Sequence, residues 1–375
     1  MSDIFDYLTW RGDMDFSADP INCVDALIFS RISYFPFDAI RENMDGSALT
    51  ISEAWKLLNT KYGKMSESDF LAADDLRLFS ALSKSRRFGN LSLRNYKNIY
   101  NKQAQEQFAA VTIECGKWSF IAYRGTDDTL VGWKEDFNMG FSSPVPSQAE
   151  AVRYLEESAS YSNDLPLYVG GHSKGGNLAV YAALFCTADV QSRIAAVYNN
   201  DGPGFDRDVI SGAAFRTLKD RIFTFVPQSS VVGMLLEHEE NYIVIHSTQT
   251  GILQHDLYSW EVLGKDFIRL SSTTNGSRFV DRTLKDWVAQ MSFEQRSSFF
   301  DSLYDIVSST NAESFSELKE DWFKNSKIII NSLMNKDEET KKIIIKTILQ
   351  LIRTTKNNLS EFSPAGKEKM LPDEI

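Results

Sequence analysis

One short segment, residues 168–177, constrains the fold of this chain more than any other. It contains Gly171-His-Ser-Lys-Gly175, a G-x-S-x-G pattern. An apolar run at 165–169 precedes the pattern and predicts a buried strand, and a run rich in Ala and Leu at 178–186 follows it and predicts a helix. A strand, a glycine-flanked turn and a helix in this order are typical of a nucleophile elbow. We therefore expect the Ser173 hydroxyl to stand exposed at the end of the strand, with its backbone near the helix N-terminus.

Two other interpretations of these glycines are open. The segment could be a tight turn with an idle serine, or a loop that binds phosphate. A phosphate-binding loop needs a Gly-Lys-Ser/Thr sequence after its glycines, and none follows here. The strand before the turn and the helix after it favour the nucleophile over the idle serine.

Bulk properties narrow the class of protein. The 375 residues are 43% hydrophobic and carry a net charge of −11, which allows a large core and argues against nucleic acid as the main partner. The first residues are acidic where a signal peptide would be basic and apolar, and no stretch approaches a membrane-spanning length. Three scattered cysteines form neither a disulfide framework nor a metal-binding pattern. These features predict a cytoplasmic protein, and they leave its oligomeric state open.

Strand and helix signals alternate through the middle of the chain. A hairpin is expected from two β-rich runs joined at Gly116-Lys117, and a helix is expected to start at Ser147, which forms a capping-box pattern with Glu150. Alternation of this kind predicts a mainly parallel sheet covered on both faces. The expected strands besides the one before Ser173 are 109–115, 118–123, 194–198, 222–226 and 242–246.

The two ends of the chain look helical. Residues 1–108 are predicted to be mostly helical, with helical spacing at 51–58 and 70–83 and an apolar segment at 25–35 that fits a helix or a strand. We expect the main domain to span 1–282, a helical extension to span 283–359, and a disordered tail to span 360–375.

The last predicted helix has a basic amphipathic pattern. In the segment 341–353, apolar residues at 344, 345, 348 and 352 form a helix face, and all the charges are basic. A membrane-surface helix would have this pattern. An ordinary packed helix or an oligomer contact would have it too, and we favour that interpretation.

A serine hydroxyl needs a general base, and the chain offers four histidines. His172 is a poor base because adjacent side chains on a strained turn diverge. His238 lies in an acidic segment, and His246 ends a predicted strand, where it could be structural. His255 suits the order nucleophile, acid, histidine that follows a nucleophile elbow, since it lies on an irregular segment late in the sheet.

The acid that orients the base is expected after a strand that follows the elbow. Asp201 lies in a glycine-rich loop directly after the strand at 194–198, although an Asp in such a loop can also serve only local hydrogen bonding. Asp206 and Asp208 are close enough to compete. The segment after the next strand, 226–231, contains no carboxylate, so we favour Asp201.

Donors for an oxyanion are expected from two backbone N–H groups, those of Lys174 and of a residue after an earlier strand. Thr126 fits the second position because Gly125 before it allows close backbone approach. The Lys174 side chain needs no role and is expected to be a solvated residue at the helix start. Arg124 and Asp136 are expected to pair and brace the loop.

These residues carry a resemblance to a known family. The combination of Tyr123-Arg-Gly-Thr126, Trp133, Asp136 and the Ser173 elbow looks like class 3 (fungal-type) lipases. More closely, the chain resembles the bacterial Mbeg-like family of the α/β-hydrolase superfamily. That likeness covers about residues 1–265 and rests on Tyr7-Leu-Thr-Trp-Arg-Gly-Asp13, Asp25-Ala-Leu-Ile28, Asn199-Asn-Asp-Gly-Pro-Gly204, Val226-Pro-Gln-Ser-Ser-Val-Val-Gly233, Gln254-His-Asp256 and Trp260.

The resemblance implies an α/β-hydrolase fold with Ser173 as nucleophile, His255 as base, and Thr126 and Lys174 at the oxyanion hole. It also shows a departure, because class 3 lipases usually place the acid after the later strand, where this chain has Gln228-Ser-Ser230. We predict a serine hydrolase that acts on a lipid-like or other small acyl ester or thioester, with Asp201 as the acid and with no cofactor or metal. The alternative is a catalytically weak or inactive hydrolase-fold protein with a binding or regulatory role. A third interpretation, a membrane-associated lipid binder, rests only on the basic helix at 341–353.

Overall fold

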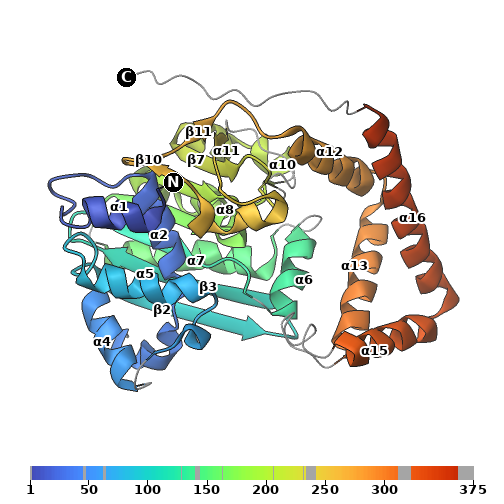
Figure 1. Cartoon of the computed structure of the whole chain (residues 1–375), viewed down its shortest axis with the longest axis horizontal. Coiled ribbons are helices and arrows are strands. Elements are labelled where there is room, and N and C mark those ends of the chain that lie inside the picture. The colour runs from blue at the N-terminus through green and yellow to red at the C-terminus, as the bar shows by residue number, and fades with distance from the viewer. Residues whose placement is uncertain are drawn as a thin grey trace.

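The computed structural model of the chain is built around one large mixed sheet (Figure 1). It describes residues 2–361 except for 45–47, 62–64, 128, 140–143, 163, 206, 231, 234–241 and 311–321. The nine strands lie in the order β1-β2-β3-β4-β5-β6-β7-β8-β11, with the five from β4 to β8 parallel and the others antiparallel. The strands are β1 (Leu49–Thr50), β2 (Ser92–Asn101), β3 (Glu106–Glu114), β4 (Ser119–Tyr123), β5 (Leu167–His172), β6 (Ile194–Asn200), β7 (Ile222–Pro227), β8 (Ile243–Ile245) and β11 (Arg269–Leu270).

The central strands bury both of their faces, as parallel strands generally do. Side chains alternate across a strand, so Phe120 and Ala122 of β4 enter one core while Ile121 and Tyr123 enter the other. All four are fully buried. A parallel centre with helices on both faces and a serine turn after β5 confirms the predicted α/β-hydrolase fold.

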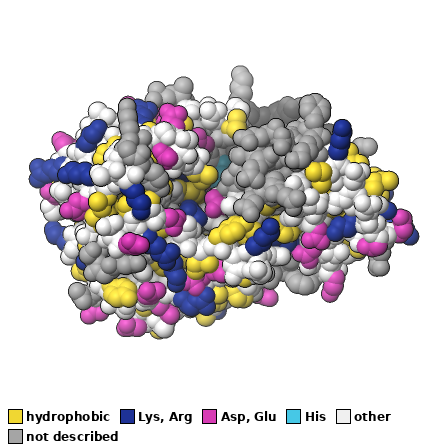
Figure 2. Space-filling model, turned by 90° about the horizontal axis from the view of Figure 1, so that it is seen from below, with side chains coloured by type: hydrophobic (Ala, Val, Ile, Leu, Met, Phe, Trp, Pro, Cys, Tyr) yellow, Lys and Arg dark blue, Asp and Glu magenta, His cyan; other side chains and the backbone are white. Residues whose placement is uncertain are grey.

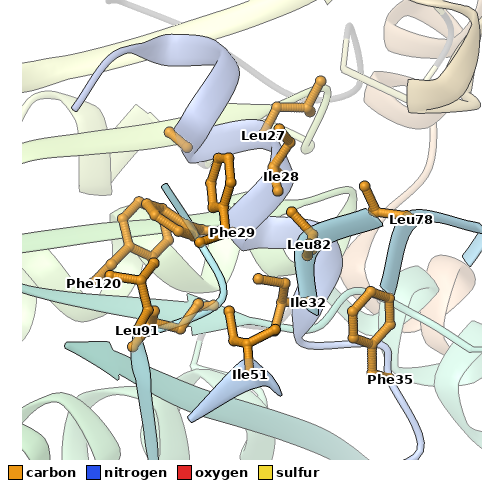
Figure 3. Packing of buried hydrophobic residues seen from close by; sticks show 14 of the residues in the cluster. Leu27, Ile28, Phe29, Ile32, Phe35, Ile51, Leu78, Leu82, Leu91 and Phe120 are labelled. Atoms are coloured by element: carbon orange, nitrogen blue, oxygen red, sulfur yellow. The ribbon is translucent and has the colours of Figure 1, made fainter. Parts of the chain in front are cut away.

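The N-terminal helices cover the first face. Phe29 of α2 meets Phe120 of β4 with ring centroids 5.0 Å apart, and leucine and isoleucine side chains from α2 and α5 belong to the same core (Figure 3). The apolar segment at 25–35 is therefore a helix over most of its length. The helices of this layer are α1 (Ile4–Arg11), α2 (Cys23–Ile32), α3 (Arg41–Met44), α4 (Ile51–Lys61) and α5 (Ala73–Lys84).

Helices from the middle of the chain cover the second face. The core there is formed mainly by α7 and α8 against the sheet, with Leu178, Ala179 and Ala182 of α8 fully buried. A small hairpin of β9 (Val262–Leu263) and β10 (Asp266–Phe267) lies apart from the main sheet. The helices are α6 (Leu130–Met139), α7 (Pro146–Tyr161), α8 (Lys174–Phe185), α9 (Ala188–Arg193), α10 (Arg207–Ile210) and α11 (Ala213–Leu218).

The C-terminal helices form a separate small cluster at the end of the molecule (Figure 1). Their core consists of Trp287, Met291, Phe299, Ile306 and Ile344. They are α12 (Asn275–Ala289), α13 (Phe293–Ser308), α15 (Trp322–Asn335) and α16 (Glu338–Glu361). Among the described residues, no helix has the length and the apolar character that crossing a bilayer requires.

The predicted apolar face of the last helix is only partly buried. Ile344 is packed, whereas Ile345 and Ile352 are exposed, and the side chain at 348 lies outside the described residues. Helix α16 therefore packs through Ile344 of the predicted face and through Thr347, which lies outside it. The tail expected from residue 360 lies outside the described residues after 361.

Two sequence predictions about elements were wrong. The N-terminal part contains the ten-residue strand β2, which was missed because its sequence is polar and lacks an apolar run; β2 is recognisable only by its pairing with β3. Helix α7 begins at Pro146, one residue before the expected start, and the Val145 N–H is bound by the Gln148 side chain at 3.1 Å. Proline at the first helical position explains this start, since it has no N–H to satisfy.

Candidate active site

The turn after β5 holds Ser173 in a strained conformation. Its backbone has φ 59° and ψ −134°, and helix α8 starts at the next residue. A Cβ on Gly171 would lie 2.2 Å from the carbonyl oxygen of Gly175, and one on Gly175 would lie 2.2 Å from that of Tyr123. Only glycine fits at these two positions, so the sequence pattern reflects how closely the backbones pack.

Asp201 and His255 meet beside this turn. Asp201 follows β6, is fully buried, and lies with its Oδ2 2.6 Å from Nδ1 of His255. Its other oxygen, Oδ1, accepts a hydrogen bond from Ser230 Oγ at 2.5 Å. Both carboxylate oxygens are thereby oriented. A neutral His255 that donates its Nδ1 proton to Asp201 keeps a lone pair on Nε2, which is the tautomer a general base requires.

Ser230 explains the departure from the class 3 lipase pattern. It lies after β7, where the resemblance suggested a carboxylate, and it is buried. Its hydroxyl also accepts the Gly233 N–H at 3.0 Å, which fixes the oxygen in place. A serine at this position thus donates to a carboxylate that follows the neighbouring strand β6.

His172 connects the elbow to the His255 segment. Its Nε2 donates to the backbone carbonyl of His255 at 2.8 Å, and the two rings lie 4.5 Å apart. Burial holds the pKa of His172 well below its usual range, so the ring stays neutral. As expected, His172 does not have the position of a base, and it instead fixes the backbone of His255.

Among the described contacts there is no hydrogen bond between Ser173 Oγ and His255 Nε2. Catalytic hydrogen bonds are often long without substrate and shorten in the complex. The structure thus brings Asp201 and His255 into direct contact, and it links Ser173 to them through its neighbour His172.

The competing candidates lie elsewhere or outside the described residues. His246 Nδ1 is 2.5 Å from Glu261 Oε2, so this histidine has a different carboxylate partner. Asp208 is exposed on α10. His238 and Asp206 fall outside the described residues.

Backbone N–H groups near Ser173 are free to donate hydrogen bonds to an oxyanion, as far as the described residues show. Lys174 is the first residue of α8, so no carbonyl of the helix accepts its N–H. The N–H of Thr126 binds no acceptor within the described part of the chain. Gly125 packs against the elbow so tightly that a Cβ there would lie 3.1 Å from Ser173 Cβ. The Lys174 N–H thus belongs to the residue directly after Ser173, and Thr126 directly follows the glycine that packs against Ser173.

Asp136 supports the Thr126 loop in a way that the sequence did not predict. It accepts a hydrogen bond from Thr126 Oγ1 at 2.5 Å. The expected pairing of Arg124 with Asp136 was wrong, because the Arg124 guanidinium binds Asn98 at 3.0 Å and Asp127 at 3.4 Å. The Thr126 hydroxyl, rather than the Arg124 guanidinium, donates to Asp136.

The expectation of a solvated Lys174 side chain was also wrong. The side chain is fully buried beneath the elbow, where Nζ donates to Glu135 Oε2 at 2.9 Å and to both oxygens of Gln107 at 2.7 Å. Glu135 also accepts backbone N–H groups of Gln107 and Ser147. One ion pair thus joins α8 to α6, β3 and the start of α7.

Replacing Lys174 with methionine is expected to lower the free energy of unfolding by about 3–5 kcal/mol, because it leaves Glu135 as a buried charge without its partner. Urea unfolding followed by circular dichroism measures this change. The matched control is Arg86→Met, which breaks the exposed pair with Asp15 and should change the free energy of unfolding far less, because solvent screens that pair. Equal effects of the two substitutions would contradict the role given to Lys174.

Burial raises the pKa of Asp136 from 3.8 to about 6. Between pH 4 and 6 the folded state therefore binds more protons here than the unfolded chain, so this group lowers stability as pH rises. We expect the wild type to lose stability relative to Asp136→Asn over that interval. Urea midpoints of both proteins at pH 4, 5, 6 and 7 test this, and a difference that is constant or that changes in the opposite direction would contradict it.

Sequence reasoning missed Ser230, Glu135 and the role of His172. The Ser230 position could have been found, since it lies where the resemblance places the acid. Nothing in the sequence near Glu135 indicates its partner 39 residues away. Within the described ranges, no group of three or more His, Cys, Asp or Glu side chains is arranged to hold a metal ion.

Comparison with known proteins finds similar solved structures and a matching sequence family, and the structures are lipases. Rhizomucor miehei lipase, solved as a propeptide complex, has 14% identity and a TM-score of 0.39, over 64% of this chain and 80% of the lipase. Lipase II from Rhizopus niveus has 12% identity and a TM-score of 0.37, over 62% and 93%. No curated protein sequence matches the chain.

A sequence model of the Mbeg1-like family matches residues 82–305, which is more than half of the chain. The matched region holds the elbow, the Asp201 loop and the His255 segment. The chain therefore belongs to the Mbeg1-like family.

Proposed function

We propose that this protein is a serine hydrolase that cleaves a carboxylic ester or thioester through an acyl-enzyme on Ser173. The observation that supports this most is the contact between buried Asp201 and His255 beside a strained serine turn. Buried carboxylate–histidine pairs next to such a turn are the arrangement that activates a serine. The nearby N–H groups of Thr126 and Lys174 add donors for the oxyanion.

The proposed reaction follows from these positions. Ser173 Oγ attacks the acyl carbon while His255 Nε2 takes its proton, and Asp201 stabilises the imidazolium that forms. The carbonyl oxygen becomes an oxyanion and accepts the N–H groups of Thr126 and Lys174. The intermediate collapses as His255 returns the proton to the leaving alcohol or thiol.

Water completes the cycle by the same route. His255 takes a proton from water, the hydroxide attacks the acyl-enzyme, and Ser173 leaves with the proton that His255 returns. Each step uses only groups of this chain and water, so the proposed reaction needs no cofactor. We propose a lipid-like or other small acyl group as substrate.

Hydrolysis of p-nitrophenyl esters of graded acyl length tests the proposal and its substrate class together. We expect turnover above the rate without protein for at least one chain length, with the preferred length indicating the size of the acyl group. A folded protein that hydrolyses none of these esters and none of the matching acyl-thioesters would overturn the proposal and favour a binding role.

A further inference from the structure

We propose that residues 31–34, at and just after the end of helix α2, position both loops of the candidate site. Tyr34 acts on residues 124–126, called the oxyanion loop below, and Arg31 acts on the His255 segment, residues 251–258. This inference rests on the proposed function, because it assigns positioning residues to the same site. It concerns a part of the chain that lies before the region matched by the family model, which starts at residue 82.

Tyr34 joins the oxyanion loop to the elbow. Its hydroxyl accepts the Gly125 N–H at 2.9 Å and donates to the His172 carbonyl at 3.3 Å. The side chain is buried, and burial raises the pKa of the hydroxyl to about 12, so it keeps its proton at neutral pH. The two residues that it links come directly before Thr126 and Ser173. Tyr34 therefore fixes the spacing between the donor and the nucleophile.

Arg31 reaches the segment that carries His255. Its guanidinium forms a buried two-pronged pair with Asp75, at 2.5 Å and 2.7 Å. Asp75 Oδ1 also accepts the hydroxyl of Tyr258 at 2.6 Å, three residues after His255. Because the pair is buried and held by two contacts, it anchors one end of the His255 segment to α2 and α5.

The same guanidinium links the two halves of this element. Arg31 lies over the Tyr34 ring at 4.5 Å and over the Tyr258 ring at 5.6 Å. Phe5 of α1 stacks on Tyr258 from the N-terminal layer, with ring centroids 5.8 Å apart. The oxyanion loop and the His255 segment are thus contacted by one cluster of N-terminal residues, which contains Arg31, Tyr34 and Phe5.

The N-terminal layer contains a matched control. Tyr7 donates to Asp25 at 2.8 Å, and Asp25 is paired with the buried Arg87, so this is a second arginine–aspartate–tyrosine group. The polar partners of Tyr7 are Asp25 and Asn22, and both lie in the N-terminal part. Tyr7→Phe therefore removes an equivalent hydroxyl without touching either loop of the site.

The experiment compares Tyr34→Phe, Tyr258→Phe and Tyr7→Phe with the wild type in ester hydrolysis. We expect the first two to lower kcat about 10- to 100-fold with KM within about twofold, because small misplacements of catalytic groups cost this much. Tyr7→Phe is expected to change stability but to leave kcat within about twofold. An equal kcat in all three variants would overturn the inference.

Hydrogen–deuterium exchange of the folded proteins gives a second readout that does not depend on activity. Tyr34→Phe should speed exchange in the peptide that contains Gly125, and Tyr258→Phe should speed it in the peptide that contains His255. Tyr7→Phe should change neither. If the wild type hydrolyses no ester, the proposed function fails, and unchanged exchange at both peptides would separately overturn the positioning inference.

Discussion

Ser173→Ala is expected to lower kcat for ester hydrolysis about 10⁶-fold, which is the effect of removing the nucleophile in serine hydrolases of this type. The physical reason is that the substitution removes the hydroxyl from the strained turn after β5, directly beside His172, which binds the His255 backbone. Steady-state kinetics on the best p-nitrophenyl ester measure the loss, and circular dichroism checks that the variant is folded.

His255→Ala should have nearly the same effect, and the double variant should be no slower than either single one. This lack of additivity is expected because the two groups act in one step. A double variant that is much slower than both singles would show that Ser173 and His255 work independently, which contradicts the proposed mechanism.

Asp201→Asn is the second large effect, with an expected fall in kcat of about 10⁴-fold. An amide can donate to Nδ1 and so favours the tautomer whose Nε2 carries the proton, which cannot accept one from Ser173. The Ser230 hydrogen bond to Oδ1 can remain, so the variant should fold. KM should change little, since Asp201 is fully buried.

Asp208→Asn is the control for this substitution, because Asp208 is exposed on α10 and was the competing candidate that the structure describes. It should keep wild-type kcat. If Asp208→Asn impaired turnover as strongly as Asp201→Asn, or if Asp201→Asn stayed within about threefold of the wild type, the assignment of the acid would be wrong.

Much of the fold could be predicted because its central part has strong local signals. The strands around Ser173 are short apolar runs, as expected for strands that bury both faces. In the structure their alternate side chains enter the two cores, so these runs were correctly predicted as strands. The polar strand β2 could not be found in this way, since its place depends on pairing with β3 rather than on its own composition.

The same distinction between local signals and distant contacts applies to the candidate site. Patterns in neighbouring residues indicated Ser173, Asp201, His255 and the loop at Thr126, and the structure brings the second and third into contact. The buried Lys174 side chain could not be foreseen, because its partner Glu135 is distant in sequence and a lysine after an elbow usually meets solvent. Contacts between distant residues decided what local patterns left open.

Peptide mapping by mass spectrometry after reaction with a fluorophosphonate tests the central claim most directly. The wild-type protein should carry one phosphonyl group on Ser173, and His255→Ala should label far more slowly because its serine is no longer activated. A folded wild-type protein that stays unlabelled, or that carries the group on a residue other than Ser173, would contradict the account.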